Sequence, residues 1–307
     1  MRIIHGKVVT VLSVIVFGFC AFSQAQQANE PPPLPFHAAE GCGGVFATHM
    51  AYLVNGDPKG GIGLPAAGGI YVNMGHGRHM YSLTATETLW NRLELGYAHI
   101  SFDMGDLPDA IAEATTVRIS EKFVEMHNCN ARLMLLKEGE FGQTWMPAVT
   151  LGVHYKQNMT VEDIDRELGG TLTSIGIDEN DGVDCTLYAT KMLTMLPKPV
   201  IVTAGVRSTE AAHLGLLGFT GERKIVAEGS VCAFVAQNTI VGVEYRQKSS
   251  DYAPVPGLIG AEDDWLTFDV GYIVNSHMTV AAGYARFGEV LNHGANDSFG
   301  LALKWEL

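Results

Sequence analysis

The last nine residues, 299–307, alternate strictly between two kinds of side chain. The odd-numbered positions are apolar and the even-numbered ones are small or charged: Phe299, Leu301, Leu303, Trp305 and Leu307 against Gly300, Ala302, Lys304 and Glu306. Successive side chains of a β-strand point to opposite faces, so this pattern predicts a strand with one wholly apolar face. A strand that ends in this way, with a tryptophan near its end, is typical of the lipid-facing wall of a transmembrane β-barrel.

The same stretch resembles the carboxyl-terminal signal that the bacterial barrel-assembly machinery reads. That signal combines a polar residue, a glycine and two spaced hydrophobic residues, here Ser298, Gly300, Leu303 and Trp305. It normally ends in Phe or Tyr, whereas this chain ends in Leu307. Because the other four positions match the signal, we expect the barrel-assembly machinery to be a partner of the chain.

Strand-like runs recur along the rest of the sequence and are separated by gaps that are alternately short and long. Twelve runs are predicted, at 69–75, 79–89, 92–104, 120–136, 143–156, 184–194, 199–208, 223–235, 239–248, 264–274, 278–288 and 297–307. Outer-membrane barrels combine short periplasmic turns with long outside loops, while a soluble sandwich has no reason to sort its turns in this way. The sequence thus predicts an all-β fold: a transmembrane antiparallel up-and-down β-barrel of about twelve strands.

The amino-terminal part predicts export and a segment that precedes the barrel. Arg2 and Lys7 are followed by an apolar run and by Ser23-Gln24-Ala25, which is typical of a secretory signal peptide over residues 1–25. Residues 26–66 form a periplasmic or lumenal segment with a proline-rich tether at Pro31–Pro33, and this segment could plug the barrel. We assign residues 67–307 to the barrel and place the protein in the bacterial outer membrane.

The alternation sorts wall residues into a lumen set and a membrane set. The lumen candidates are Glu94, His154, Arg207, Glu228, Glu244, Arg246, Asp269 and Lys304. The residues expected in the aromatic girdles or the assembly signal are Trp145, Tyr155, Tyr245, Tyr272, Phe299, Gly300, Leu303, Trp305 and Leu307. In run 92–104 the pattern changes face near Ala98, which predicts a β-bulge there.

Mixed charge inside a lumen has two interpretations. One is a polar constriction that filters small solutes, as in a passive or gated channel. The other is a set of paired ions that fill a narrow, sealed barrel with a structural or adhesive role, because isolated charges in a low-dielectric interior are costly. Porin-like passage of small solutes is the leading hypothesis, and outer-membrane lipid and lipopolysaccharide are the expected surroundings.

Composition excludes other classes of function. The formal net charge is −13, and loss of Arg2 and Lys7 with the leader makes it more negative, which argues against nucleic acid as a partner. The later cysteines, Cys42, Cys129, Cys185 and Cys232, show no metal-binding spacing. No cofactor and no metal site are expected.

The sequence contains few features that are typical of an enzyme. A barrel that modifies lipids would need a serine and a histidine at a lipid-facing strand edge, and His293 with Ser298 is the candidate pair. No serine lies in a recognisable nucleophile motif, so no catalytic residue is assigned. His76 and His79 could contribute to a metal site, but two ligands do not make one.

Several stretches resemble a known bacterial envelope family. They are 146–156 (MPAVTLGVHYK), 228–230 (EGS), 243–248 (VEYRQK), 256–265 (PGLIGAEDDW) and the terminal FGLALKW. The family is domain of unknown function 3034, and the resemblance spans roughly residues 44–307. It implies an envelope barrel and assigns no activity or catalytic residues.

Overall fold

The computed structural model describes residues 36–307, except positions 55, 58, 249, 251, 257, 258, 291, 292 and 296 and the side chains of 290 and 293. Twelve strands close into one antiparallel barrel in which each strand pairs with its neighbour in the chain and the last, β16, pairs with the first, β3. The barrel strands are β3 (Ala66–Asn73), β4 (His79–Leu89), β5 (Leu93–Asp103), β6 (Phe123–Leu136), β7 (Ala148–Asn158), β8 (Asp181–Leu193), β9 (Val200–Ala212), β10 (Gly218–Ala236), β11 (Thr239–Arg246), β12 (Trp265–Ile273), β13 (Met278–Arg286) and β16 (Ser298–Glu306). The predicted fold class and strand number are confirmed.

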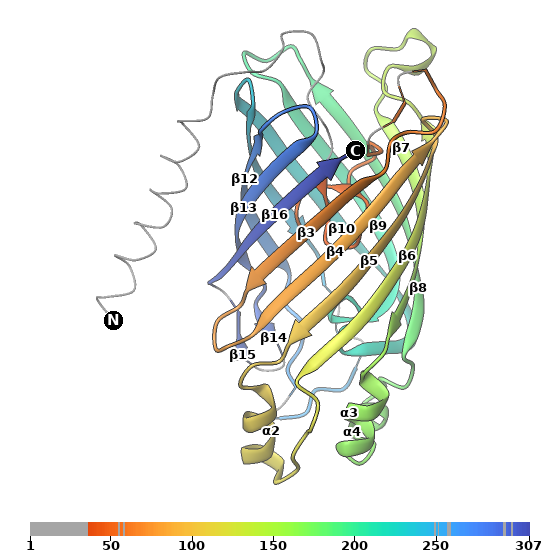
Figure 1. Cartoon of the computed structure of the whole chain (residues 1–307). Coiled ribbons are helices and arrows are strands. Elements are labelled where there is room, and N and C mark those ends of the chain that lie inside the picture. Colours follow the sequence, from red (N-terminus) through yellow and green to blue (C-terminus); the bar gives the residue numbers. More distant parts are fainter. Residues whose placement is uncertain are drawn as a thin grey trace, which may run out of the picture.

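The two ends of the barrel differ, as Figure 1 shows. The carboxyl terminus lies at one end, with the connections 90–92, 137–147, 194–199, 237–238 and 274–277; we call this the turn end. The opposite, loop end carries α2 (Leu107–Thr115), α3 (Val161–Glu167), α4 (Thr171–Ser174) and the small sheet of β14 (Glu289–Val290) and β15 (His293–Gly294). One predicted long gap, 209–222, is mostly strand instead, because β9 and β10 extend and leave only residues 213–217 between them, which include the 3₁₀ turn η2 (His213–Gly215).

The outer surface of the wall is apolar. Large exposed hydrophobic side chains recur at alternate positions of the strands, including Leu83, Leu95, Leu133, Leu151, Val153, Leu187, Val206, Val231, Val243, Phe268, Val270, Leu301 and Leu303. An apolar band of outward-facing residues is the surface that a transmembrane barrel presents to lipid. Among the described residues, no helix is both long and apolar enough to cross a membrane.

A segment that precedes the wall fills part of the lumen. Residues 36–54 are buried throughout, with only Tyr52 partly exposed. The segment contains the two short strands β1 (Phe36–His37) and β2 (Gly43–Gly44), which pair with each other. We call residues 36–54 the plug. The leader 1–25 and the tether 26–35 lie outside the described residues.

The inner face of β5 changes character along the barrel axis. In β5 the buried positions run from Glu94 near the turn end to Ala98, Ile100 and Phe102 near the loop end. The pairing of β5 with both neighbours is continuous from Leu93 to Asp103, so the predicted β-bulge near Ala98 is wrong. The side chains of β5 stay on one face, and it is the inner face of this strand that changes from polar to apolar. On β11 the order is reversed, from Ile240 near the turn end to Glu244 and Arg246 near the loop end.

A plugged lumen as the candidate functional site

One carboxylate of the plug, Glu40, is the centre of a buried ionic network. Its Oε1 lies 2.6 Å from Lys156 Nζ, and its Oε2 lies 2.7 Å from Arg207 Nη2 and 3.1 Å from Arg246 Nη1. His49 Nε2, also from the plug, is 3.0 Å from the same Oε2. Because these cations belong to β7, β9 and β11, a single plug side chain links three strands of the wall.

Two wall carboxylates complete the network. Asp184 Oδ2 lies 2.7 Å from both Lys156 Nζ and Arg207 Nη1. Glu228 Oε1 lies 2.7 Å from Arg207 Nε and 3.1 Å from Arg246 Nε. Three carboxylates thus face three cations, and such balance is what allows charges to be buried without a large uncompensated cost.

A third wall carboxylate, Glu244 of β11, holds the bend of the plug at residues 46–48. It accepts hydrogen bonds from the backbone N–H groups of Phe46, Ala47 and Thr48 at 2.6–3.1 Å. The hydroxyl of Thr48 donates a further bond of 2.6 Å. Glu244 therefore fixes the backbone of the plug itself.

The ion pair of Arg132 with Glu94 binds two separate stretches of the plug, one at Gly43 and one at residues 50–54. The two side chains are 2.7 Å apart, and Arg132 also donates to the backbone carbonyls of Gly43 and Met50. Glu94 accepts from the backbone N–H of Val54 at 2.7 Å. The two stretches of the plug are thus bound to the same pair of wall residues.

Glycines of the wall make room for plug side chains. A Cβ placed on Gly300 would lie 2.1 Å from the ring of Phe46, and one on Gly271 would lie 2.5 Å from the ring of Phe36. Both glycines occupy inward-facing positions of strands, where a side chain would occupy the space of the ring. Glycine within a strand often marks such a close approach.

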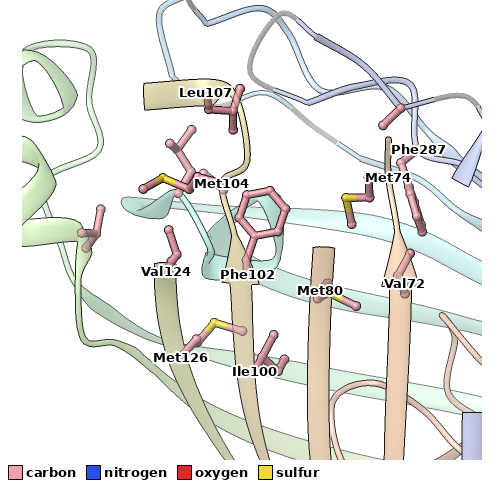
Figure 2. Close-up of a cluster of buried hydrophobic side chains, with 14 of the residues drawn as sticks. Val72, Met74, Met80, Ile100, Phe102, Met104, Leu107, Val124, Met126 and Phe287 are labelled. Carbon is pink, nitrogen blue, oxygen red and sulfur yellow. The ribbon is translucent and has the colours of Figure 1, made fainter. Parts of the chain in front are cut away.

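The loop end of the lumen holds an apolar cavity of about 90 Å³. Figure 2 shows the surrounding cluster, in which side chains of β3 to β6 meet Leu107 of α2 and Phe287. The lining residues are Met74, Met80, Phe102, Met104, Leu107, Ile111, Ile119, Val124, Val161, Ile164, Leu168, Leu172, His213, Leu216, Leu217, Ile259, Trp265 and Phe287. The cluster reaches Ala39 and Phe46, so an apolar region runs from the loops to the plug.

His213 is the one ionisable side chain among these lining residues. Its Nε2 lies 3.1 Å from Tyr252 Oη, and its backbone N–H donates to Glu262 at 3.0 Å. Burial lowers the pKa of His213, and Glu262 offsets only part of that effect. Burial alone would raise the pKa of Glu262, but Lys248, 2.9 Å away, and His213 outweigh it and lower that pKa.

The structure places all the predicted lumen residues inside the barrel. Glu94, His154, Arg207, Glu228, Glu244, Arg246, Asp269 and Lys304 are all buried. They do not line an open polar constriction, because Glu94, Arg207, Glu244 and Arg246 bind the plug. The network members outside that set are Glu40, His49, Lys156 and Asp184. Inward-facing charge in runs 143–156 and 184–194 indicates Lys156 and Asp184. The pattern of residues 26–66 contains nothing that indicates Glu40 or His49.

The predicted membrane-facing residues divide into three groups. Tyr155, Tyr245, Leu303 and Trp305 are exposed on the outer wall, Phe299 is partly exposed, and Leu307 is exposed after the end of β16. Trp145 is exposed but lies in the connection before β7. Tyr272, with 7% exposure, is buried and lacks the exposure that a girdle residue would show. Gly300, predicted as the glycine of the assembly signal and not as a girdle residue, is buried beneath Phe46.

The candidates for catalysis and metal binding are dispersed. Ser298 is fully buried, and its hydroxyl donates to the carbonyl of Ala295 at 3.0 Å. It therefore does not lie at a lipid-facing edge; the side chain of His293 lies outside the described residues. His76 lies 3.4 Å from Asp106, whereas His79 bonds to Tyr71 at 2.9 Å. A different set, Cys42, His49 and His154, brings three possible ligand atoms within 4.8 Å of one another.

These features define a closed outer-membrane-type β-barrel with a lumen plugged by the segment that precedes its wall. The chain belongs to the family described as "Protein of unknown function (DUF3034)", whose model matches residues 39–304. No protein with a curated description matches the sequence.

Solved barrels resemble the chain at low identity. The KdgM porin matches with 7% identity and a TM-score of 0.47, over 79% of this chain and 99% of the porin. Omp33 of Acinetobacter baumannii matches with 8% identity and a TM-score of 0.43, over 81% and 100%. The NanC porin matches with 12% identity and a TM-score of 0.43, over 79% and 100%. At this level of similarity the likeness says nothing about function.

Proposed function

We propose that this protein is a gated channel of the bacterial outer membrane for small apolar solutes, and that the plug is its closed gate. The observation that carries the proposal is the division of the lumen. The loop end holds an apolar cavity, and beside it the plug fills the lumen from Gly271, near the turn end, to Gly300 and Arg246, near the loop end. An apolar region that reaches the plug at Ala39 and Phe46 supports entry from the loop end and exit past the plug.

Apolar solutes are favoured over ions or sugars because of the lining. Polar solutes would lose their hydration among methionine, leucine, isoleucine and phenylalanine side chains without hydrogen bonds in return. Apolar cavities of somewhat larger size, about 150 Å³, stay dry and bind benzene. Three methionines, Met74, Met80 and Met104, give the lining the flexibility to adapt to different shapes.

The same proposal places the loop end outside the cell and the termini in the periplasm. Export by the leader 1–25 and insertion by the barrel-assembly machinery belong to it. Outer-membrane lipid and lipopolysaccharide would then surround the apolar wall.

An engineered disulfide between plug and wall tests the gate. A Cβ on Gly242 of β11 would lie 3.8 Å from Val45 Cγ1 of the plug, so side chains at these two positions are in van der Waals contact and two cysteines there would be neighbours. We would express Val45→Cys with Gly242→Cys in a Cys232→Ser background and measure uptake of radiolabelled benzene by whole cells. Uptake should stop when the disulfide is oxidised and return on reduction, while each single cysteine variant should behave like Cys232→Ser.

A sealed structural barrel is the competing outcome. In that case uptake would equal that of cells without the barrel in every redox state. Reconstituted protein would also pass no ions after any substitution that frees the plug. This combination of results would overturn the proposed function.

A further inference from the structure

Three buried side chains of the lumen form a possible ligand set, and only one of them, His49, also contacts the ionic network. Cys42 and His49 belong to the plug, and His154 belongs to β7 of the wall. Their possible ligand atoms lie within 4.8 Å of one another, and all three residues are fully buried. We propose that Cys42, His49 and His154 bind one Cu(I) ion.

His154 supplies an independent reason to expect a ligand. Neither of its ring nitrogens has a hydrogen-bond partner among the described residues. A buried, unsatisfied polar group is costly and rare, so two on one imidazole need an explanation. A bound cation provides one, since it would satisfy a nitrogen lone pair that nothing else in the lumen meets.

One ring nitrogen of His49 has a carboxylate partner, as in many metal-binding histidines, while the ring itself stacks on that of His154 with the ring centres 4.9 Å apart, so the two rings must tilt to bind one ion. The Nε2 atom of His49 lies 3.0 Å from the carboxylate of Glu40. Donation from Nε2 to a carboxylate leaves the lone pair on Nδ1, which is the usual arrangement around a metal-binding histidine. Arg207 Nη2 is almost equidistant from the two ring nitrogens, at 3.5 and 3.4 Å, so it lies across the ring and does not bond to one nitrogen alone.

The identity of the cation follows from ligand chemistry and charge. A thiolate with two imidazoles is a soft ligand set that suits copper and zinc. The surrounding network already balances Glu40, Asp184 and Glu228 against Lys156, Arg207 and Arg246. Cu(I) with the Cys42 thiolate adds no net charge to this interior, whereas Zn(II) would leave one positive charge unpaired, which is costly.

The site is sealed, so loading is tested during folding. The full-length chain would be refolded into detergent with Cu(I) under reducing, anaerobic conditions and then challenged with a Cu(I) chelator. We expect one copper per folded barrel, with one sulfur and two nitrogen neighbours by X-ray absorption. Cys42→Ser and His154→Gln should each weaken retention by about 100-fold or more, since even outer-shell partners account for roughly 10–100-fold.

Cys232→Ser is the matched control, because Cys232 is also a buried lumen cysteine but lies outside the cluster. The different migration of boiled and unboiled samples on a gel would verify that each variant has folded, with Cys42→Ala as the substitute for a misfolded Cys42→Ser. Equal copper retention by wild type and both cluster variants would overturn the site. Folded wild type that retains Zn(II) but no Cu(I) would overturn the choice of metal. Neither result depends on whether the barrel is a channel.

Discussion

Phe46 of the plug packs directly against Gly300 of the last strand, where a Cβ would lie 2.1 Å from the ring. A glycine of the last strand therefore provides the space that the ring of Phe46 occupies. Gly300 also occupies the glycine position of the predicted assembly signal. One glycine thus has two interpretations, and substitution can separate them.

Gly300→Ala should dislodge the tip of the plug without preventing closure of the barrel. The added methyl group overlaps the ring of Phe46, and overpacking of this kind costs about 1–3 kcal/mol. Endoproteinase Glu-C should then cleave after Glu40, which is buried in the wild type. The control is Gly69→Ala on β3, where a Cβ makes only an ordinary 3.8 Å contact with Leu83. Loss of the folded barrel in Gly300→Ala would instead favour the assembly role.

Glu244→Gln should loosen the bend of the plug. The carboxylate accepts backbone bonds from residues 46–48, and a hydrogen bond to a charged group contributes about 1.5–3 kcal/mol. Hydrogen exchange of these amides should accelerate by about tenfold or more, since 1.4 kcal/mol corresponds to about a factor of ten. Glu125→Gln, a wall carboxylate that contacts Ser101 and His99, is the control. Unchanged exchange at residues 46–48 would contradict the role given to Glu244.

Glu40→Gln should destabilise the barrel. It leaves three buried cations facing two carboxylates, and breaking a buried ion pair costs about 3–5 kcal/mol. Unfolding in urea, followed by the loss of the compact gel band, measures the effect. Adding Arg246→Met restores the balance of charge and should recover part of the stability. A double variant that is less stable than Glu40→Gln would show that packing, and not charge, determines the result.

The loops that cover the cavity should loosen as the pH falls. The pKa values of both His213 and Glu262 are lowered in the fold, so the unfolded chain takes up protons at a higher pH than the folded one. Their contribution to stability is therefore complete above the ordinary histidine pKa of about 6.5 and is lost progressively below it. Hydrogen exchange in 252–256 and 259–264 should be faster at pH 5.5 than at pH 7.5, after correction for intrinsic rates. His213→Gln should reduce the difference, and an equal pH response in that variant would contradict this assignment.

The alternation of residues was enough to predict the wall. Run 79–89 coincides with β4 (His79–Leu89), and run 239–248 differs from β11 (Thr239–Arg246) only at its end. The reason is that period-two alternation is a local property, set by each strand's own two faces. The pattern at Ala98 was misread for the same reason: alternation distinguishes inside from outside but does not say what the inside contains.

The contents of the lumen could not be predicted because they depend on contacts between distant residues. Glu40 stands in a segment without periodicity, and its partners Arg207 and Arg246 are 167 and 206 positions away in the chain. Tyr272 continues an outward pattern with Phe268 and Val270 but is buried, which no neighbouring residue indicates. The apolar cavity likewise gathers residues from strands and from loops that had no strand pattern to follow.

The separation between Glu40 and Arg246 also sets an order of events. The plug is the first described part of the chain to be synthesised, yet two of its partners, Arg246 of β11 and Gly300 of β16, lie in late strands. Contacts of such long range form slowly, because the intervening chain must be ordered before they bring any gain. Phe46 cannot reach its packed position until the last strand, which contains Gly300, has paired with the first strand. Packing of the plug therefore indicates that the wall is complete. A barrel that lacks its last strand would have an open lumen.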